Sequence, residues 1–379
     1  MVPMQTDAKV YDMSISKIVI TGGPCGGKTT ALSRIQRDLS HLGYTVLIVP
    51  ETATSLISGG VAPWTCASNE EYQKCQMTLQ LQKEQIFEQA ARTMPQEKII
   101  IVCDRGEMDN KVYMSDDEFG RVLDYLGTNE AELRDGYDAV FHLITAAKGA
   151  EEFYTLENNG ARYESVDEAA ALDDKFIAAW TGHPYFRVID NSTDFEGKMR
   201  RLIREIAYYL GELHPYEIER KYLVEFPNLA WLESLDACER VEISQHYLRS
   251  DPDQEIRIRR RGSGENSMYY LTEKRISEGH TVLRTQRRLT EGEYHMLLVQ
   301  ADPKRREICK TRYCLTYENQ YFEIDIFPCW SDQALAEIEL SSEETPVHFP
   351  PELKVIREVT GDPRYRNAAI AALPKGATH

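Results

Sequence analysis

The sequence predicts an α/β P-loop domain, with a parallel sheet wrapped by helices, followed by an antiparallel β-barrel tunnel domain with covering helices. From Lys17 to about Leu213, apolar runs alternate with helical patterns, which is typical of a parallel sheet. After His214 and Pro215, strand-like segments carry charged residues on one face and apolar residues on the other, which favours antiparallel strands. A length of 379 residues also exceeds what one hydrophobic core usually supports, so we expect two domains.

The elements of the first domain follow from apolar runs and helix-end signals. Strands are expected at residues 17–21, 44–50, 98–103, 139–144 and 186–189. Ser68 and Glu71 have the spacing of a capping box, which predicts a helix that runs to about Arg92. A last helix is expected from about Asp194 to Gly211, where the glycine would end it. The predicted divisions are an N-terminal extension at 1–16, domains at 17–213 and 215–362, and a tail at 363–379 with a short helix.

Composition excludes several classes of protein. An apolar content of 42% and a mean hydropathy of −0.47 are ordinary for a soluble globular protein. No apolar run approaches the roughly 18 residues of a membrane span, and the N-terminus lacks the features of a signal peptide, so we expect a cytoplasmic protein. A net charge of −17 disfavours nonspecific nucleic-acid binding. The oligomeric state stays open.

The eight cysteines lie far apart, without a CxxC pair. This spacing predicts reduced thiols rather than a disulfide framework or a zinc site. One of them, Cys25, lies in a glycine-rich loop, where we expect a packing role rather than a redox role.

That loop directly follows the first predicted strand and precedes a helical pattern. It fits G-x-x-x-x-G-K-[ST] through Gly22, Gly27, Lys28 and Thr29, and the flanking strand and helix argue against an ordinary turn. Backbone N–H groups would bind phosphates, Lys28 would neutralise the terminal ones, and the Thr29 hydroxyl would reach Mg²⁺. The predicted nucleotide-binding residues of the loop are Gly22, Gly23, Pro24, Cys25, Gly26, Gly27, Lys28, Thr29 and Thr30.

Two acidic residues end predicted strands at the sheet edge where such folds bind ligands. Asp104 would hold Mg²⁺ through water or act as a catalytic base toward an acceptor hydroxyl, and Glu51 points to the same edge. Either acid could instead cap the next helix. The polar segment 148–165 follows the fourth strand and contains Arg162, which could belong to a mobile lid over the nucleotide or be a solvated arginine.

With these residues, the first domain resembles the NadR-type, kinase-like branch of P-loop NTPases, which is often labelled AAA-like. The supporting segments are 22–30, 50–54, 104–106 and 183–195. The resemblance implies binding of ATP or GTP, with Lys28 and Asp104 catalytic and with Asp190, Asn191 and Ser192 near the base. An N-K-x-D signature is absent, so the choice between ATP and GTP stays open.

Charged and apolar residues alternate in the strands of the second domain, at 217–224, 255–261, 323–327 and 337–340. We expect the isoleucine face to pack outward under helices and the charged face to line a closed barrel with a tunnel. A surface sheet laced with salt bridges is the alternative. In a tunnel, a polyphosphate would satisfy the cations, and Mg²⁺ or Mn²⁺ would satisfy the carboxylates.

The E-x-E-x-K pattern at 217–221 resembles the hallmark of the CYTH, or triphosphate tunnel metalloenzyme, family. The resemblance implies attack of a metal-activated water on a terminal phosphorus, with Glu219 and Lys221 in catalytic roles. It also implies triphosphate binding by Lys221, Arg257, Arg259, Lys274, Lys310 and Arg312, and metal binding by Glu217, Glu219, Glu337 and Glu339 with Asp325 assisting.

One strand departs from that family pattern. Arg284 and Gln286 stand where relatives commonly carry inward glutamates. Loss of these acids should weaken a second metal or the activation of water, so binding could persist where hydrolysis is slow.

The order of the two domains resembles the TRPL translocation-defect type, for which GTP and phosphoinositide binding are described, and plant proteins with a uridine-kinase-like domain before a tunnel domain. The first hypothesis is an Mg²⁺-dependent enzyme that acts on nucleoside triphosphates at the P-loop and hydrolyses tripolyphosphate or nucleoside triphosphates in the tunnel. The alternative is a nucleotide-switched protein whose tunnel recognises a phosphoinositide or another polyanion without turnover. An RNA 5′-triphosphatase is less favoured, because aromatic stacking platforms are not evident among the basic strands.

Overall fold

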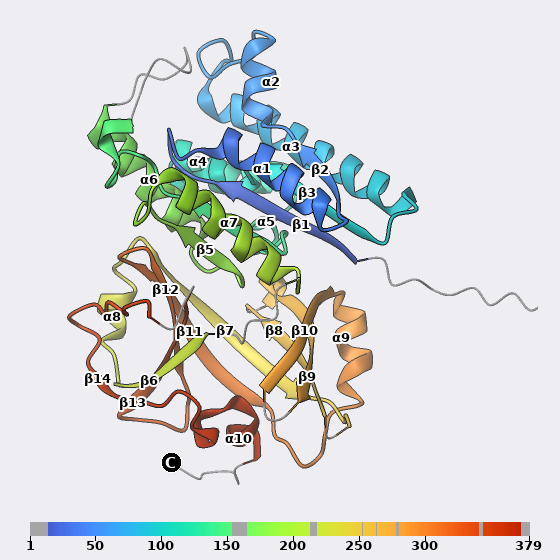
Figure 1. Cartoon of the computed structure of the whole chain (residues 1–379), viewed down its shortest axis with the longest axis vertical. Coiled ribbons are helices and arrows are strands. Elements are labelled where there is room, and N and C mark those ends of the chain that lie inside the picture. The colour runs from blue at the N-terminus through green and yellow to red at the C-terminus, as the bar shows by residue number, and fades with distance from the viewer. Residues whose placement is uncertain are drawn as a thin grey trace, which may run out of the picture.

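The computed structural model describes residues 14–153, 165–212, 218–251, 253–262, 264–277, 280–340 and 344–372. These residues form two sheets, of five and nine strands, that occupy opposite halves of the molecule (Figure 1). The halves built on the smaller and the larger sheet are called the N-terminal and the C-terminal domain below. The boundary predicted near residue 213 and residues 1–13 of the extension predicted at 1–16 lie outside the described residues, while residues 14–16 belong to the first strand.

The five-stranded sheet is parallel, and its strand order is β2-β3-β1-β4-β5. Its strands lie where apolar runs predict them: β1 (Ser14–Thr21), β2 (Thr45–Val49), β3 (Lys98–Asp104), β4 (Ala139–Leu143) and β5 (Phe186–Ile189). The prediction of a parallel sheet wrapped by helices is therefore confirmed. Because β1 is central, the loop that follows it lies in the middle of the ligand-binding edge.

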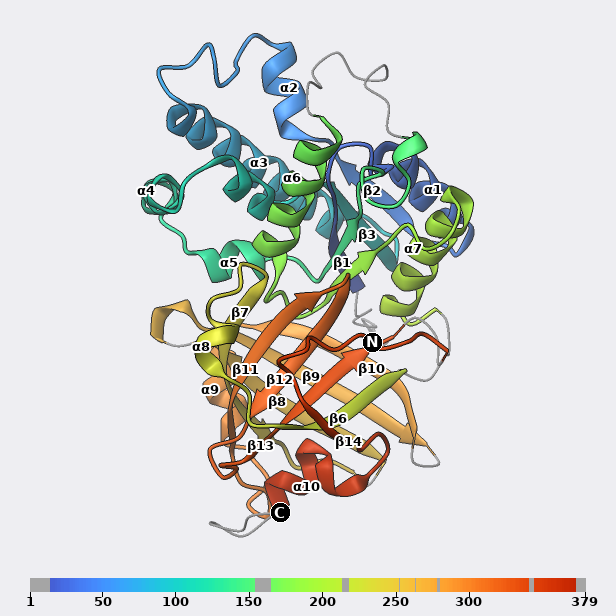
Figure 2. The ribbon, with the colours of Figure 1, turned by 90° about the vertical axis from the view of Figure 1, so that its left-hand side faces the viewer.

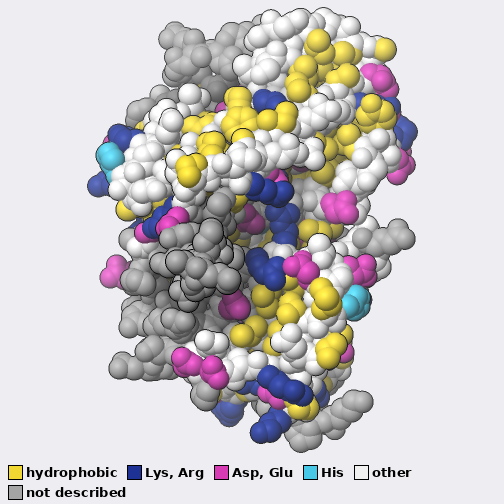
Figure 3. Space-filling model, turned by 90° about the vertical axis from the view of Figure 1, so that its right-hand side faces the viewer, with side chains coloured by type: hydrophobic (Ala, Val, Ile, Leu, Met, Phe, Trp, Pro, Cys, Tyr) yellow, Lys and Arg dark blue, Asp and Glu magenta, His cyan; other side chains and the backbone are white. Residues whose placement is uncertain are grey.

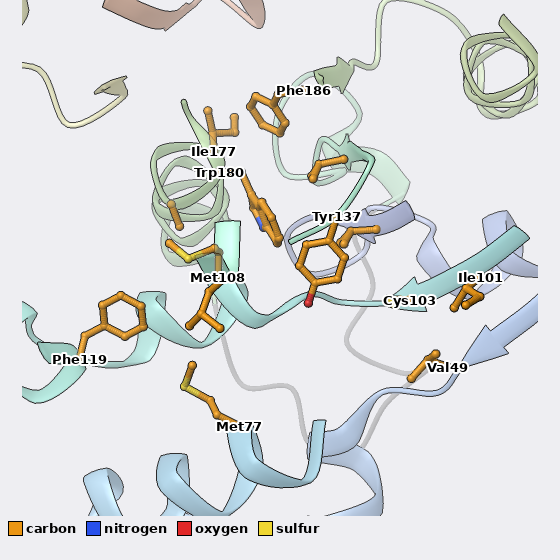
Figure 4. Close-up of a cluster of buried hydrophobic side chains, with 14 of the residues drawn as sticks. Val49, Met77, Ile101, Cys103, Met108, Phe119, Tyr137, Ile177, Trp180 and Phe186 are labelled. Carbon is orange, nitrogen blue, oxygen red and sulfur yellow. The ribbon is translucent and has the colours of Figure 1, made fainter. Parts of the chain in front are cut away.

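Helices cover both faces of this sheet. Their bounds are α1 (Lys28–His41), α2 (Thr52–Ser58), α3 (Asn69–Thr93), η1 (Glu107–Tyr113), α4 (Asp116–Leu126), α5 (Glu130–Arg134), η2 (Glu151–Phe153), α6 (Val166–Trp180) and α7 (Phe195–Tyr209). On one face, Ile35 of α1 and Leu202 of α7 pack with Ile20. On the other face, Trp180 packs with Tyr137 and Met108 (Figure 4).

Two helices begin where the sequence predicts a helix start. The Ser68 side chain accepts a hydrogen bond from the Glu71 backbone N–H at 3.2 Å, and α3 begins at the next residue. Asp194 does the same for the Gly197 N–H at 2.8 Å before α7. Each cap satisfies one of the backbone donors left free at a helix N-terminus.

The nine-stranded sheet is antiparallel, in the order β10-β9-β8-β7-β11-β12-β13-β6-β14. Its elements are β6 (Glu219–Glu225), α8 (Leu229–Leu232), β7 (Cys238–Tyr247), β8 (Gln254–Arg261), η3 (Gly264–Asn266), β9 (Met268–Ser277), β10 (His280–Leu289), α9 (Glu291–Leu298), β11 (Ile308–Tyr317), β12 (Gln320–Ile326), β13 (Gln333–Glu339), β14 (Val355–Glu358), η4 (Pro363–Tyr365) and α10 (Asn367–Ala372). The sheet curves strongly (Figures 1 and 2).

The expectation of a closed barrel is wrong for the described residues, because the edge strands β10 and β14 do not pair with each other. Strand β14 has four exposed residues, and its pairing with β6 is interrupted between Val355 and Arg357. A short, irregular and exposed edge strand is a poor template for further pairing. The sheet is therefore curved but open.

The apolar face of the large sheet packs outward under helices, as predicted. Ile324 and Ile338 belong to a cluster with Leu232 of α8, and Ile258 belongs to one with Tyr294 of α9. One end of the opposite face is also apolar, where Leu335 packs near Ile370 of α10. That helix lies at the end of the sheet far from the N-terminal domain (Figure 2). Among the described residues, no helix is both long and apolar enough to cross a membrane.

Candidate nucleotide and polyanion sites

The glycine-rich loop packs tightly against the end of β4. A Cβ atom on Gly22 would lie 2.2 Å from the Leu143 carbonyl oxygen, and one on Gly26 would lie 2.7 Å from the same atom. Gly27 has a left-handed backbone with φ 93° immediately before α1. These positions therefore require glycine, and the chain turns from β1 into α1 as a P-loop must.

Lys28 lies at the first turn of α1 and bends back over the loop. Its Nζ donates hydrogen bonds to the carbonyl oxygens of Gly22 at 2.8 Å and Gly23 at 3.2 Å. Burial, followed by repulsion from Arg105, lowers the pKa of Lys28 to about 7. A phosphate beside Lys28 would stabilise its charged form, and neutralising the terminal phosphates is the role predicted for Lys28. Thr29 and Thr30 follow in the same turn and are exposed.

The two acids predicted at the sheet edge lie beside this lysine. Burial, followed by the nearby Glu51 carboxylate, raises the pKa of Asp104. Glu51 accepts a hydrogen bond from Arg105 Nε at 2.7 Å, and this contact holds its pKa down although burial alone would raise it. Glu51 occupies the N-cap position of α2 without a capping bond from its side chain. The negative charges of Asp104 and Glu51 both act on Lys28 and favour its charged form.

Asp173 of α6 lies behind the loop and was not predicted from the sequence. Its Oδ1 accepts hydrogen bonds from the backbone N–H of Gly23 at 3.0 Å and of Thr145 at 3.2 Å, and lies 3.0 Å from His142 Nε2. Lys148 Nζ donates to its Oδ2 at 3.1 Å. Burial would raise the pKa of Asp173, but His142 and Lys148 hold it well below the usual range. The charged carboxylate fixes the loop to β4 and α6.

The three residues predicted to lie near the base, Asp190, Asn191 and Ser192, form contacts within the N-terminal domain. Asp190 forms an ion pair with Arg201 at 2.7 Å and accepts from the Ser192 hydroxyl at 2.6 Å. Asn191 donates to the carbonyl oxygens of Thr145 at 2.8 Å and Lys148 at 2.7 Å. These three candidates therefore brace the chain after β5, and their proposed place near the base stays untested. Arg162 lies outside the described residues.

In the C-terminal domain, the predicted charged residues lie on one face of the curved sheet, called the inner face below. The strand register places Arg312 opposite Asp325, Glu323 opposite Glu337, and Glu337 opposite Lys221. On the other side of β7, Arg257 and Arg259 stand opposite Thr272 and Tyr270. The described residues of the inner face that carry charge include Glu219, Lys221, Glu239, Glu255, Arg257, Arg259, Arg261, Lys274, Arg288, Lys310, Arg312, Glu323, Asp325, Glu337 and Glu339.

The acidic half of this face is formed by β6, β12 and β13, and its carboxylates contact cations. Lys221 lies 2.5 Å from Glu337 and 3.3 Å from Glu219. Burial would raise the pKa of Glu337, but Lys221, Lys310 and Arg312 hold it far below the usual range. On the face shown in Figure 3, Lys and Arg side chains likewise gather near the junction of the two domains, with Asp and Glu side chains beside them. Glu217 lies outside the described residues.

The basic half, on β8, β9 and β10, is less well balanced. Arg259 is 9% exposed, and its Nη2 donates a long hydrogen bond of 3.4 Å to Gln286 Oε1. Among the described residues, Nε of Arg257 and Nε of Arg259 are buried without a hydrogen-bond partner. Burial, followed by repulsion from Arg257 and Arg261, lowers the pKa of Arg259. Buried donors and unbalanced positive charge mark a place for an anion.

The carboxylates of the acidic half have the chemistry that a divalent cation requires. Glu219 stands opposite Glu339, and Glu323 opposite Glu337, so oxygen donors from three adjacent strands face the same interior. Such donors match Mg²⁺ and Mn²⁺. Among the described residues, no three carboxylate, histidine or cysteine side chains converge as a ready metal site. Cation binding would therefore require some of these carboxylates to leave their lysine and arginine partners.

Comparison with known proteins finds one family for the N-terminal part of the chain and another for a different part. The sequence model of the AAA domain family matches residues 17–198, which confirms an AAA-like P-loop domain. An inorganic triphosphatase of Nitrosomonas europaea is 34% identical over 160 residues, which are 41% of this chain and 96% of that protein. The chain belongs to this inorganic triphosphatase family.

A second curated relative and a solved structure are also similar to this chain. The inorganic triphosphatase of Acetivibrio thermocellus is 32% identical over 162 residues, which are 42% of this chain and 94% of that protein. A crystal structure of an inorganic triphosphatase is 31% identical, covers 42% of this chain and 97% of its own, and has a TM-score of 0.30. The two curated relatives confirm the predicted likeness of the C-terminal part to triphosphatases, while the finer TRPL type is not shown.

Three charged residues of these sites were not among the predicted ligands. Asp173 interrupts the apolar pattern of α6, and Arg187 interrupts that of β5, which are signals of buried polar contacts. Arg261 shares the alternation of Arg257 and Arg259, so strand periodicity alone could have included it. It forms an ion pair with Asp135 of the N-terminal domain at 2.7 Å.

Proposed function

We propose that this protein binds ATP or GTP at its P-loop and hydrolyses a triphosphate, either tripolyphosphate or a nucleoside triphosphate, on the inner face of its C-terminal domain with Mg²⁺ or Mn²⁺. The nucleotide site is assigned to residues 17–213 and the triphosphate site to residues 215–362. The observation that carries the second assignment is Arg259, a buried guanidinium with cationic neighbours and an unpartnered Nε among the described residues.

A triphosphate would supply what this half of the face lacks. Its oxygens accept hydrogen bonds in the geometry that arginine favours, and its charge offsets repulsion between Arg257, Arg259 and Arg261. The names of the two curated relatives, both inorganic triphosphatases, support this substrate class. They give no support to phosphoinositide recognition, which is set aside.

Hydrolysis would join the oxygen of water to the terminal phosphorus and break the bridging P–O bond, releasing phosphate and a shortened polyphosphate. A bound divalent cation would neutralise the terminal phosphate and lower the pKa of the attacking water. Glu219, Glu337 and Glu339 would hold that cation, and Arg257 and Arg259 would hold the rest of the chain. Lys221, now between Glu219 and Glu337, would then be free to contact a phosphate oxygen.

Phosphate release from tripolyphosphate with Mg²⁺ or Mn²⁺ tests this assignment. We expect Glu337→Gln to lower the rate by at least ~100-fold, in the range of a lost transition-state contact, and Lys28→Ala to leave it unchanged. Glu242→Gln is the matched control, because Glu242 lies on the opposite face and pairs with Arg240. Full activity of Glu337→Gln, or its loss in Lys28→Ala, would contradict the assignment.

The P-loop is proposed as a separate site for nucleotide binding with phosphoryl transfer or hydrolysis. Gly22, Lys28 and Asp104 support this role, and the kinase-like and TRPL resemblances remain predictions. In the Glu337→Gln background, residual ATP or GTP hydrolysis should disappear on adding Lys28→Ala. Residual turnover that survives both changes would place nucleotide chemistry elsewhere.

A further inference from the structure

Arg187 of the N-terminal domain reaches the acidic half of the inner face. It lies on β5, and its Nη2 is hydrogen-bonded to Glu339 of β13. Glu339 stands opposite Glu219 in the register of β6 and β13, so it belongs to the row of carboxylates proposed to hold the cation. A guanidinium from one domain thus occupies a proposed metal ligand of the other.

Contacts within its own domain hold Arg187 in this place. Its guanidinium lies 4.0 Å from the centre of the Tyr185 ring, and Nη1 donates to the Phe186 carbonyl oxygen at 3.1 Å. Its Nε lies 3.8 Å from Glu205 of α7, and its side chain is only 16% exposed. Arg187 is therefore a fixed part of the domain junction rather than a mobile surface arginine.

A second ion pair joins the basic half of the inner face to the N-terminal domain. Arg261, at the end of the row that contains Arg259, pairs with Asp135 and also donates to the Gly182 carbonyl oxygen. Burial would raise the pKa of Asp135, but Arg261 and Arg134 hold it at about 2. Both charged rows of the inner face thus end in contacts with the N-terminal domain.

We propose that Arg187 is a positioning residue of the triphosphate site, which holds Glu339 in the metal-free protein and yields it when a divalent cation binds. This inference rests on the proposed function. The positive charge of Arg187 offsets that of the Glu339 carboxylate and repels a divalent cation, so Arg187 competes with the cation. Glu205 is close enough to take over the displaced guanidinium. The domain junction therefore sets the metal concentration at which the site fills.

Binding of Mn²⁺ to the full-length protein without substrate, measured by titration calorimetry, tests the competition. Arg187→Gln should bind Mn²⁺ about tenfold more tightly, since Glu339 no longer has to leave a cation. Glu205→Gln should bind it several-fold more weakly, because Arg187 then loses the carboxylate of its own domain that lies 3.8 Å from its Nε. Thr316→Val is the control, because it removes a neutral contact of 2.9 Å with Thr181 across the same junction and should change nothing.

Arg187→Gln and Glu205→Gln are expected to change the affinity for Mn²⁺ in opposite directions, so either variant alone can test the competition if the other does not fold. Unchanged or weaker Mn²⁺ binding by Arg187→Gln, or unchanged or tighter binding by Glu205→Gln, would overturn the competition. Equal gains in Arg187→Gln and Thr316→Val would also overturn it, because they would trace the effect to loosening of the domains. Absence of Mn²⁺ binding by the wild type, or its persistence in Glu337→Gln, would instead contradict the proposed function and remove the basis of the inference.

Discussion

Arg312 on β11 and Asp325 on β12 stand directly opposite each other, and Arg312 donates from Nε and Nη2 to the two carboxylate oxygens at 2.6 and 2.7 Å. Lys310 contacts the same carboxylate, and all three side chains are buried. Asp325 is therefore the carboxylate that these two adjacent buried cations share. Its predicted role beside a metal would require it to leave both of them.

Asp325→Asn should accordingly destabilise the protein more than it impairs metal binding. Removing one partner of a buried charge network typically costs about 3–5 kcal/mol in the free energy of unfolding. Chemical denaturation of wild type and variant measures this loss, and Glu318→Gln, which breaks an exposed pair with His348, serves as control. A loss below about 1 kcal/mol, the level of a surface pair, would contradict the role as buried counter-ion.

Nucleotide binding at the P-loop should take up a proton. The pKa of Lys28 is about 7 in the nucleotide-free protein, and the phosphates of a nucleotide would raise it. Because the bound state then holds more protons above pH 7, affinity should fall as the pH rises from 7 toward 9. Calorimetric titration at pH 8 in two buffers of different ionisation enthalpy should show an uptake of up to about one proton.

Lys28→Arg is the matched variant for this experiment, since it keeps the positive charge but does not titrate in that range. It should bind nucleotide without a buffer-dependent enthalpy. A wild type that shows the same absence of proton uptake would mean that Lys28 is already charged in the free loop.

The shape of the loop can be tested with two glycines that both have positive φ. Gly22→Ala should abolish nucleotide binding, because its Cβ would lie 2.2 Å from the Leu143 carbonyl oxygen. Gly43→Ala carries only the cost of a left-handed backbone, about 1 kcal/mol, because nothing lies within 4 Å of its Cβ. Fluorescent nucleotide titration of both variants measures the difference. Retained binding by Gly22→Ala would show that the loop moves away from β4 when nucleotide enters.

Lowering the pH should reduce the free energy of unfolding, because His183 is buried in its neutral form. Its Nδ1 accepts from the Tyr185 N–H at 3.0 Å and its Nε2 lies 3.1 Å from the Tyr137 carbonyl oxygen, so only the neutral ring fits. Burial lowers its pKa to about 4. Since the unfolded ring binds a proton near pH 6.5, stability is full above that pH and falls, by up to about 3 kcal/mol, as the pH drops toward 4.

Denaturant unfolding at pH 7.5 and pH 5 measures this slope. His183→Gln can keep both hydrogen bonds without a titrating group, so it should flatten the slope between these pH values. His295→Gln changes an exposed histidine and should leave the slope as in the wild type. An unchanged slope in His183→Gln would assign the acid sensitivity to other groups.

Local patterns predicted most of the fold and the P-loop. The five parallel strands follow from apolar runs, and the cap at Ser68 follows from its spacing to Glu71 within one turn of the helix start. The loop at 22–29 is contiguous in sequence, so its site needs no knowledge of distant contacts. The charged inner face was predictable because a strand repeats every two residues.

Contacts between distant segments set the limit of these predictions. Gly23 and Asp173 are 150 positions apart, and Arg187 and Glu339 are 152 positions apart, so no local period joins them. Closure of the barrel depends on whether β10 and β14 meet, which the alternation within each strand does not report. Alternation shows which face carries charge, while the pairing of those charges depends on register and on the neighbouring domain.

Binding of tripolyphosphate without metal tests the central claim most directly, because it depends on the basic half of the inner face alone. Arg259 and Arg260 are neighbours on β8, but Arg259 is buried on the inner face and Arg260 is exposed on the other. In titration calorimetry, Arg259→Met should weaken binding at least ~10-fold, about 1.4 kcal/mol or more, and Arg260→Met should leave it within ~2-fold. Equal affinities of the two variants, or an equal loss in both, would contradict a triphosphate site on this face.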